Sequence, residues 1–220
     1  MGNEFTDLGD AVADRKYTVD VTAKIPVNAR TPEGEKVRLA IRWPTDAEWG
    51  ERKRSIKYLT THLGRGRSET EPVTSPETDL KIFDAIKLNG APQLDPEEAA
   101  RVLDLLGRCD VREVEIEGNH ATVTLSVLGG EVRHTMRVPT AKQARTMREA
   151  AAKLRQLPHN RVEARILLEP PVKLWEECEG KSEDYKDGKV PAPHKDTAIR
   201  AVIEELDNEL GAAIEETDSF

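Results

Sequence analysis

Apolar and polar residues alternate in two matching stretches of the chain, which lie 95 residues apart. The first is Val37-Arg-Leu-Ala-Ile-Arg-Trp-Pro-Thr45 and the second is Val132-Arg-His-Thr-Met-Arg-Val-Pro-Thr140. Five of their nine positions are identical: Val, Arg, Arg, Pro and Thr. A period of two is typical of a strand with one buried face. Both stretches are therefore predicted to be strands that end at the proline.

Each of these strands is predicted to lead directly into a helix. An acid or amide follows the threonine by three residues in both copies, as Glu48 after Thr45 and as Gln143 after Thr140. This is the spacing of a capping box, in which the threonine hydroxyl and the Glu or Gln side chain each accept from a backbone amide of the first turn. Two capping boxes after matching strands indicate an internal repeat.

The other periodicities predict an α+β protein. Strands are predicted at 16–26, 36–43, 111–117, 121–128, 131–138 and 161–168. Helices are predicted at 46–63, 79–88, 95–107, 141–156, around Leu174-Trp175 and at about 195–215. Glycines mark the turns of the predicted antiparallel hairpins, as at Gly129-Gly130.

The repeat suggests two related units, each an antiparallel hairpin followed by a capped helix. The Ser/Thr/Glu/Pro-rich stretch after the first unit is typical of a linker. The predicted organisation is a first unit at 1–67, a linker at 68–78, a helical insert at 79–107, a second unit at 108–170 and a C-terminal helical region with an amphipathic helix at 171–220.

The composition is lean for a globular protein. Of the 220 residues, 37% are hydrophobic, 34% are charged and only 4% are aromatic. Parts of such a chain are expected to extend from the core or to be covered by partners. No apolar run approaches the ~20 residues of a membrane span. Two lone cysteines, Cys109 and Cys178, make no disulfide framework, which favours the cytoplasm.

Charge is distributed unevenly along the chain. The formal net charge is −8. Arg30–Arg67 carries ten Lys and Arg against five Asp and Glu, whereas Glu176–Phe220 carries five against fourteen. This polarity favours head-to-tail contact between copies or domains.

The sequence offers no recognisable active site. The five histidines are scattered, and none has the spacing of a metal motif. No Gly-x-Ser-x-Gly nucleophile motif is present. His134 falls on the apolar face of its strand, where Leu39 stands in the other copy, so we interpret it as a packed histidine. We expect no catalytic residues, no metal site, no cofactor and no enzymatic activity.

A basic segment is the candidate for nucleic-acid binding. Residues 52–67 combine a basic helix face with Arg65 and Arg67 on a glycine-rich loop. Such a loop can neutralise phosphates. It lacks the Gly-Lys-Ser/Thr ending of a P-loop, and arginines at a helix C-terminus also complement the helix dipole. The acidic remainder of the chain makes nucleic acid the second choice of partner, and no membrane contact is expected.

Contacts with other proteins are the first choice. Arg42 and Arg137 recur just before the two capped helices, where they either bond the adjoining helix or make equivalent contacts with a partner. The last helix carries an apolar stripe that packs on the chain itself or in a groove of a neighbouring subunit. The predicted partner-binding residues are Arg42, Arg65, Arg67, Arg137, Ile199, Val202, Ile203, Leu206 and Leu210.

The first repeat and its surroundings resemble phage proteins. Val37-Arg-x-x-x-Arg-Trp-Pro-Thr-Asp-x-x-Trp-x-Glu-Arg52, Leu63-Gly-Arg-Gly-Arg-Ser68 and Val190-Pro-x-Pro-His-Lys195 carry this resemblance. It points to phage-encoded proteins from virion-morphogenesis gene clusters, often from tail regions. The resemblance implies a non-enzymatic structural or assembly protein, either a tail component or a tail assembly chaperone. Its partners would be other phage structural proteins or copies of itself, in the host bacterial cytoplasm or in the virion.

Overall fold

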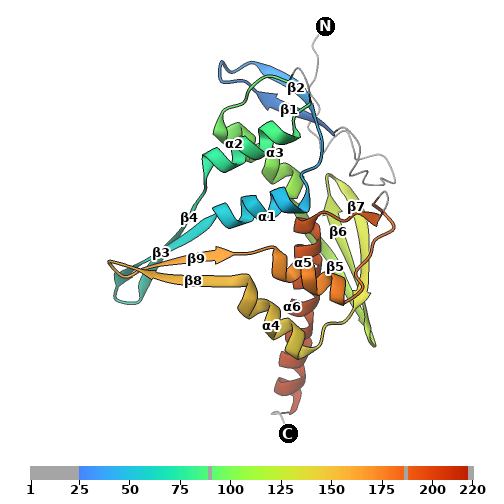
Figure 1. The fold of residues 1–220 in the computed structure, drawn as a ribbon. Coiled ribbons are helices and arrows are strands. Elements are labelled where there is room, and N and C mark those ends of the chain that lie inside the picture. Colours follow the sequence, from blue (N-terminus) through green and yellow to red (C-terminus); the bar gives the residue numbers. More distant parts are fainter. Residues whose placement is uncertain (1–24, 89–90, 186–187, 218–220) are drawn as a thin grey trace.

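The computed structural model describes residues 25–88, 91–185 and 188–217 (Figure 1). These residues form six helices and nine strands, and every pair of neighbouring strands is antiparallel. The predicted α+β class is therefore confirmed. The predicted strand 16–26 lies almost entirely outside the described residues.

The same order of elements occurs twice along the chain. The first half consists of β1 (Ile25–Arg30), β2 (Lys36–Ile41), α1 (Asp46–Ser55), β3 (Lys57–Gly64), β4 (Arg67–Val73), α2 (Pro76–Ile86) and α3 (Pro96–Gly107). The second half consists of β5 (Cys109–Glu117), β6 (His120–Val127), β7 (Gly130–Arg137), α4 (Ala141–Ala151), β8 (Ala152–Leu157), β9 (Arg161–Ile166), α5 (Glu169–Glu177) and α6 (Ala192–Thr217). Apart from β5, each half is a hairpin, a capped helix, a second hairpin and two helices.

Both predicted capping boxes are formed. The Thr45 hydroxyl accepts from the Glu48 amide at 3.3 Å, and the Glu48 carboxylate accepts from the Thr45 amide at 2.8 Å. Thr140 and Gln143 make the same reciprocal pair at the start of α4. Because these bonds satisfy amides that a helix cannot satisfy itself, both helices begin where the sequence predicts.

The strand before each capped helix also contacts a later helix end in the same way. The Arg42 amide donates to the Ile86 carbonyl at the end of α2, and the Arg137 amide donates to the Cys178 carbonyl after α5. One isolated antiparallel bridge accompanies each contact, Ile41 with Lys87 and Thr135 with Lys181. The repeat thus extends past the capped helix.

Three predicted boundaries are wrong. The helix predicted at 46–63 ends at Ser55 and continues as β3, and the helix predicted at 141–156 ends at Ala151 and continues as β8. The segment 68–78 is no linker, because most of it is β4. The run Gly64-Arg-Gly66 is a hairpin turn whose three residues have φ of +83°, +52° and +73°. Strand pairing overrides the local helical pattern here, both within the hairpins β3–β4 and β8–β9 and between β3 and β9.

The helices α2 and α3, predicted as an insert, have counterparts in the element order of the second half. In the first half they occupy the place that α5 and α6 occupy in the second half. Asp95 caps α3 by accepting from the Glu98 amide at 2.8 Å, as the sequence predicts.

One core connects the two halves. The hairpin β1–β2 packs with α2 and α3, and the sheet β5-β6-β7 packs with α6. Trp43 and Trp49 of the first half are 5% and 3% exposed, and the Trp43 ring meets the His194 ring of α6 edge to face at 6.1 Å between centroids. None of the described helices has the length and apolarity needed to cross a membrane.

The second hairpin of each half lies outside this core. The two hairpins join through β3 and β9 into one sheet of order β4-β3-β9-β8. This sheet projects from the body of the molecule, to the left in Figure 1.

Candidate functional site

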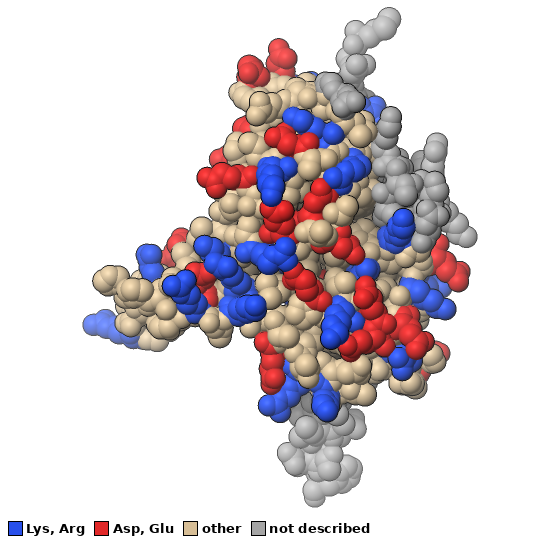
Figure 2. All heavy atoms as spheres, viewed as in Figure 1, with Lys and Arg blue, Asp and Glu red and all other residues tan. Residues whose placement is uncertain are grey.

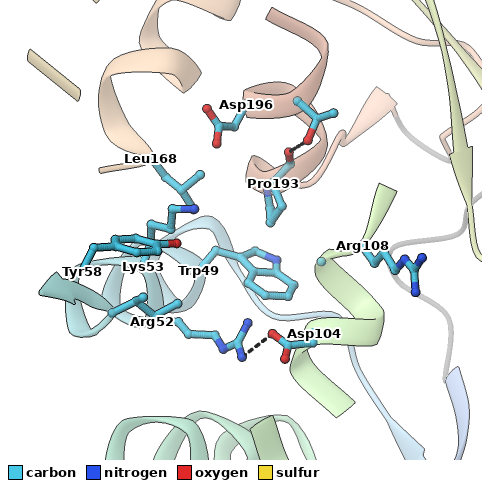
Figure 3. Close-up of a pocket in the computed structure, with 12 residues that line it drawn as sticks. Trp49, Arg52, Lys53, Tyr58, Asp104, Arg108, Leu168, Pro193 and Asp196 are labelled. Atoms are coloured by element: carbon cyan, nitrogen blue, oxygen red, sulfur yellow. Dashed lines mark hydrogen bonds and ion pairs between the residues drawn. The ribbon is translucent and has the colours of Figure 1, made fainter. Parts of the chain in front are cut away.

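Three features of the structure are candidates for a functional site: a pocket between the halves, a buried pair of histidines, and the projecting sheet. The pocket has a volume of about 320 Å³ (Figure 3). It is lined by α1, by the end of α3 and by the start of α6, through residues that include Trp49, Arg52, Lys53, Asp104, Pro193 and Asp196.

Most of the charged groups that line the pocket have an ion-pair partner, in part outside the pocket. Arg52 donates to Asp79 at 2.7 Å and to Asp104 at 2.6 Å. Asp196 forms an ion pair with Arg200. Burial lowers the pKa of Lys53 and raises the pKa of Asp196, since a charged form is disfavoured away from water. Arg52 thus links α1 to α2 and α3 of the first half, and Asp196 pairs within α6. The pocket is lined by both halves, but its ion pairs lie within each half.

A buried hydrogen-bonded cluster lies near this pocket, since Pro193 of its lining precedes His194. The Tyr185 hydroxyl lies 3.2 Å from His134 Nε2 and 2.9 Å from His194 Nδ1. All three side chains are at most 2% exposed. Burial lowers the pKa of His134 to about 4 and that of His194 to about 3, so both rings are neutral at pH 7. The prediction that His134 is a packed histidine is confirmed, and its packing is polar as well as apolar.

The projecting sheet presents two exposed edges. Every residue of β4 is exposed, and five of the six residues of β8 are exposed. Among the described residues, no strand lies beyond β4 on one side or beyond β8 on the other. Leu63 near the tip and Leu154 on β8 are 62% and 73% exposed. Exposed sheet edges present free backbone donors and acceptors to other chains.

The two edges carry opposite charge. The edge strand β4 carries Glu69 and Glu71, with Arg67 at its tip end, whereas β8 carries Lys153 and Arg155. Figure 2 shows Lys and Arg side chains gathered over part of the projecting region. Such a division of charge suits contact between one edge and the other.

The predicted arginines are not gathered in one place. Arg65 and Arg67 lie exposed at the tip of the projecting sheet. Arg42 makes two bonds with Glu48, at 2.7 and 2.8 Å, and one with the Ala85 carbonyl at 3.1 Å. Arg137 donates to the Glu177 carbonyl at 2.8 Å and pairs with Glu179. Both arginines therefore bond helix ends within the chain, which is one of the two roles predicted for them.

The basic helix face predicted within 52–67 is not a free surface. Arg52 is buried in its ion pairs, Lys53 is half-buried, and Arg54 pairs with Glu169 of α5. The exposed cations on the turn of that segment are Arg65 and Arg67.

The prediction that the apolar stripe of the last helix binds a partner is wrong for the stripe residues whose side chains the structure describes. Ile199, Val202 and Ile203 are 0%, 0% and 4% exposed and belong to the core of the chain itself. Leu206 is half-buried against the same core. These residues are unavailable to a partner because α5 and the sheet β5-β6-β7 cover them. The side chain of Leu210 lies outside the described part.

The sequence analysis missed the exposed sheet edges. Their signal is present, because Glu69 and Glu71 alternate with small polar residues and Lys153 and Arg155 flank Leu154. The composition of 68–78 favours a linker and that of 141–156 favours a helix, and both patterns outweigh this alternation. Among the described residues, no group of three His, Cys, Asp or Glu side chains could hold a metal ion.

Comparison with protein-family models, with curated proteins and with solved structures found no match for this chain.

Proposed function

We propose that this protein is a non-enzymatic structural or assembly protein that works through protein–protein contacts. The observation that carries the proposal is the projecting sheet with its two exposed edge strands. Soluble proteins protect such edges by covering, shortening or charging them, because open edges recruit other strands. Here the edges stand away from the core, and β8 carries the exposed Leu154.

The setting we propose is bacteriophage virion morphogenesis. The motifs around Val37–Arg52 and Leu63–Ser68 resemble phage tail-region proteins, and a protein with paired edge strands suits a repetitive particle. The protein would act in the host bacterial cytoplasm as a tail component or a tail assembly chaperone. A tail component would remain in the virion.

A test of this function is inactivation of the gene in the phage that encodes it. We expect infected cells to accumulate incomplete particles, such as heads without tails, because a missing assembly protein stops morphogenesis. Negative-stain electron microscopy of the lysate measures this outcome, and the wild-type gene on a plasmid should restore complete particles. Complete and infectious particles without the protein would overturn the proposal.

Two variants connect this outcome to the sheet edge. Leu154→Pro removes a backbone donor of β8, and Leu154→Ser removes only the apolar side chain. If edge pairing carries the function, Leu154→Pro should fail to restore complete particles, whereas Leu154→Ser should restore them at least in part. Circular dichroism verifies that both variants fold.

A second candidate function is nucleic-acid binding, which the exposed cations at the tip favour. Arg65 and Arg67 lie on the turn, and Arg161 of β9 pairs with Thr61 of β3 at the same end of the sheet. If these cations bind phosphates, a gel shift with DNA at low salt should weaken with added salt, and Arg65→Ala with Arg67→Ala should reduce the salt slope by about 2. No shift at low salt would remove this candidate.

A further inference from the structure

The two halves of the chain contact each other through unlike strands. In the sheet β4-β3-β9-β8, the first strand of one hairpin, β3, pairs with the second strand of the other hairpin, β9. The corresponding strands that remain are β8, which is a first strand, and β4, which is a second strand. The contact inside the chain is therefore head-to-tail and leaves at the two ends the same two kinds of edge that it joins.

We propose that β8 of one copy pairs with β4 of the next copy, repeating between chains the β3–β9 contact that joins the two halves. This inference rests on the proposed function, because it names the partner of the same sheet edges as a second copy of this chain. The sheet would then continue as β4-β3-β9-β8 through successive copies. Strand directions are compatible, since every neighbouring pair in the sheet is antiparallel and the strands alternate in direction.

Backbone hydrogen bonds define which residues face outward on each edge. The His62 amide donates to the Asn160 carbonyl at 3.2 Å. The backbone N–H and C=O groups of even-numbered residues in β3 therefore point toward β9, and those of odd-numbered residues point toward β4. The Leu167 amide donates to the Ala151 carbonyl at 2.8 Å, so the backbone N–H and C=O groups of odd-numbered residues in β8 point toward β9. The outward groups are therefore those of Ser68, Thr70 and Pro72 on β4, and of Ala152, Leu154 and Gln156 on β8.

Equivalent positions in the two hairpins define the register that we propose between copies. Leu59 pairs with Glu71 in the first hairpin, and Arg155 pairs with Glu163 in the second, with the same hydrogen-bonding phase. Leu59 and Arg155 are thus equivalent, as are Glu71 and Glu163. Because Leu59 pairs with Glu163 inside the chain, the equivalent pair between copies is Arg155 with Glu71.

This register brings opposite charges together. Arg155 would face Glu71 directly, in a non-hydrogen-bonded pair, where facing side chains are closest. Lys153 and Glu69 would be diagonal neighbours of these two residues on the same face. A twofold contact of β8 with β8 would instead oppose Lys153 and Arg155 to each other, and a contact of β4 with β4 would oppose the two glutamates. Like charges across strands are destabilising, so charge selects the head-to-tail contact.

Pro72 removes one donor from the outward edge of β4, because proline has no backbone N–H. In this register Thr70 would form the full hydrogen-bonded pair with Gln156, and the Pro72 carbonyl would accept from the Leu154 amide. A contact of this kind leaves one free edge at each end of every open assembly. It gives a closed ring if successive rotations close and an open filament if they do not.

Disulfide trapping tests the register in the full-length protein. Facing residues of a non-hydrogen-bonded pair have Cα atoms about 4.5 Å apart, within the range that a disulfide spans. Arg155→Cys and Glu71→Cys would be purified separately, mixed and oxidised gently. We expect a dimer on non-reducing gels in the mixture, several-fold above either variant alone, and a ladder of higher species from the variant that carries both cysteines.

The controls exclude other sources of cross-linking. The unmodified chain gives the background from Cys109 and Cys178, which are half-buried and buried. Glu113→Cys, an exposed position on β5, replaces Glu71→Cys in a parallel mixture. Equal cross-linking in that mixture, dimers from Arg155→Cys alone at the level of the mixture, or no dimer at all would overturn the proposal.

Charge exchange provides a second measurement. Arg155→Glu should lower the mass measured by light scattering at high protein concentration, and adding Glu71→Arg to that variant should restore it. If the gene is required for complete particles but the protein does not self-associate, this inference is overturned and the proposed function stands. If the protein self-associates but complete particles form without the gene, the proposed function is overturned and this inference stands.

Discussion

Asp79→Ala is expected to lower the free energy of unfolding by about 3 kcal/mol, because it leaves a buried arginine without its main partner. The carboxylate of Asp79 accepts from Arg52 Nε at 2.7 Å, and the two side chains are 3% and 10% exposed. The contact joins α1 to α2. The same guanidinium keeps Asp104 at 2.6 Å, which places the expected loss at the lower end of the range for such pairs.

The matched control is Asp104→Ala, which removes a partner of the same arginine. The Asp104 side chain is 70% exposed, so solvent screens the pair and the expected cost is below about 1 kcal/mol. Urea unfolding at pH 7 measures both values from the shift in midpoint at constant slope. Equal losses for the two variants would contradict the buried role of Asp79.

Lowering the pH from about 6.5 to 4 is expected to destabilise the fold markedly, because His134 and His194 are held neutral in the core. Their folded pKa values of about 4 and about 3 lie below the ordinary value of 6.5. In this pH window the unfolded chain binds protons that the folded chain does not bind. The stability that neutral histidines contribute is therefore present above pH 6.5 and is lost as the pH falls. For His134 alone the loss approaches about 3 kcal/mol at pH 4.

His134→Leu isolates that contribution. Leucine stands at the equivalent position of the first half, as Leu39, which is buried there, so the change follows a solution already present in the chain. Thermal unfolding between pH 4 and pH 7 should show a smaller acid loss in the variant, while the Tyr185–His194 bond keeps the hydroxyl satisfied. An unchanged pH profile would show that His134 does not titrate on unfolding.

Local signals were sufficient to predict the repeated corner. The alternation before Pro44 and Pro139 and the spacing from Thr45 to Glu48 act within a few residues, so the strand, its end and the helix start are written in adjacent positions. The same holds for the cap of α3 at Asp95. These elements are where the structure and the sequence prediction agree.

The projecting sheet could not be predicted in the same way. The strands β3 and β8 follow helices with only one residue or none between them, so the local helical pattern hides where each strand begins. In addition, β3 pairs with β9, which lies about 100 residues away in the chain. The stripe of α6 illustrates a second limit. Its spacing correctly indicates a buried face, yet periodicity alone does not tell whether Ile199 and Val202 are buried in the same chain or in a neighbour.

Fusion of the two halves changes the thermodynamics of any assembly that uses the β3–β9 type of contact. In an assembly built from separate halves, every such junction would form between free molecules, so its formation would depend on protein concentration. Covalent linkage makes one junction in two intramolecular, where the effective concentration of the second hairpin is fixed by the connecting chain. A growing sheet of this protein would therefore require only half as many bimolecular steps as one built from single halves.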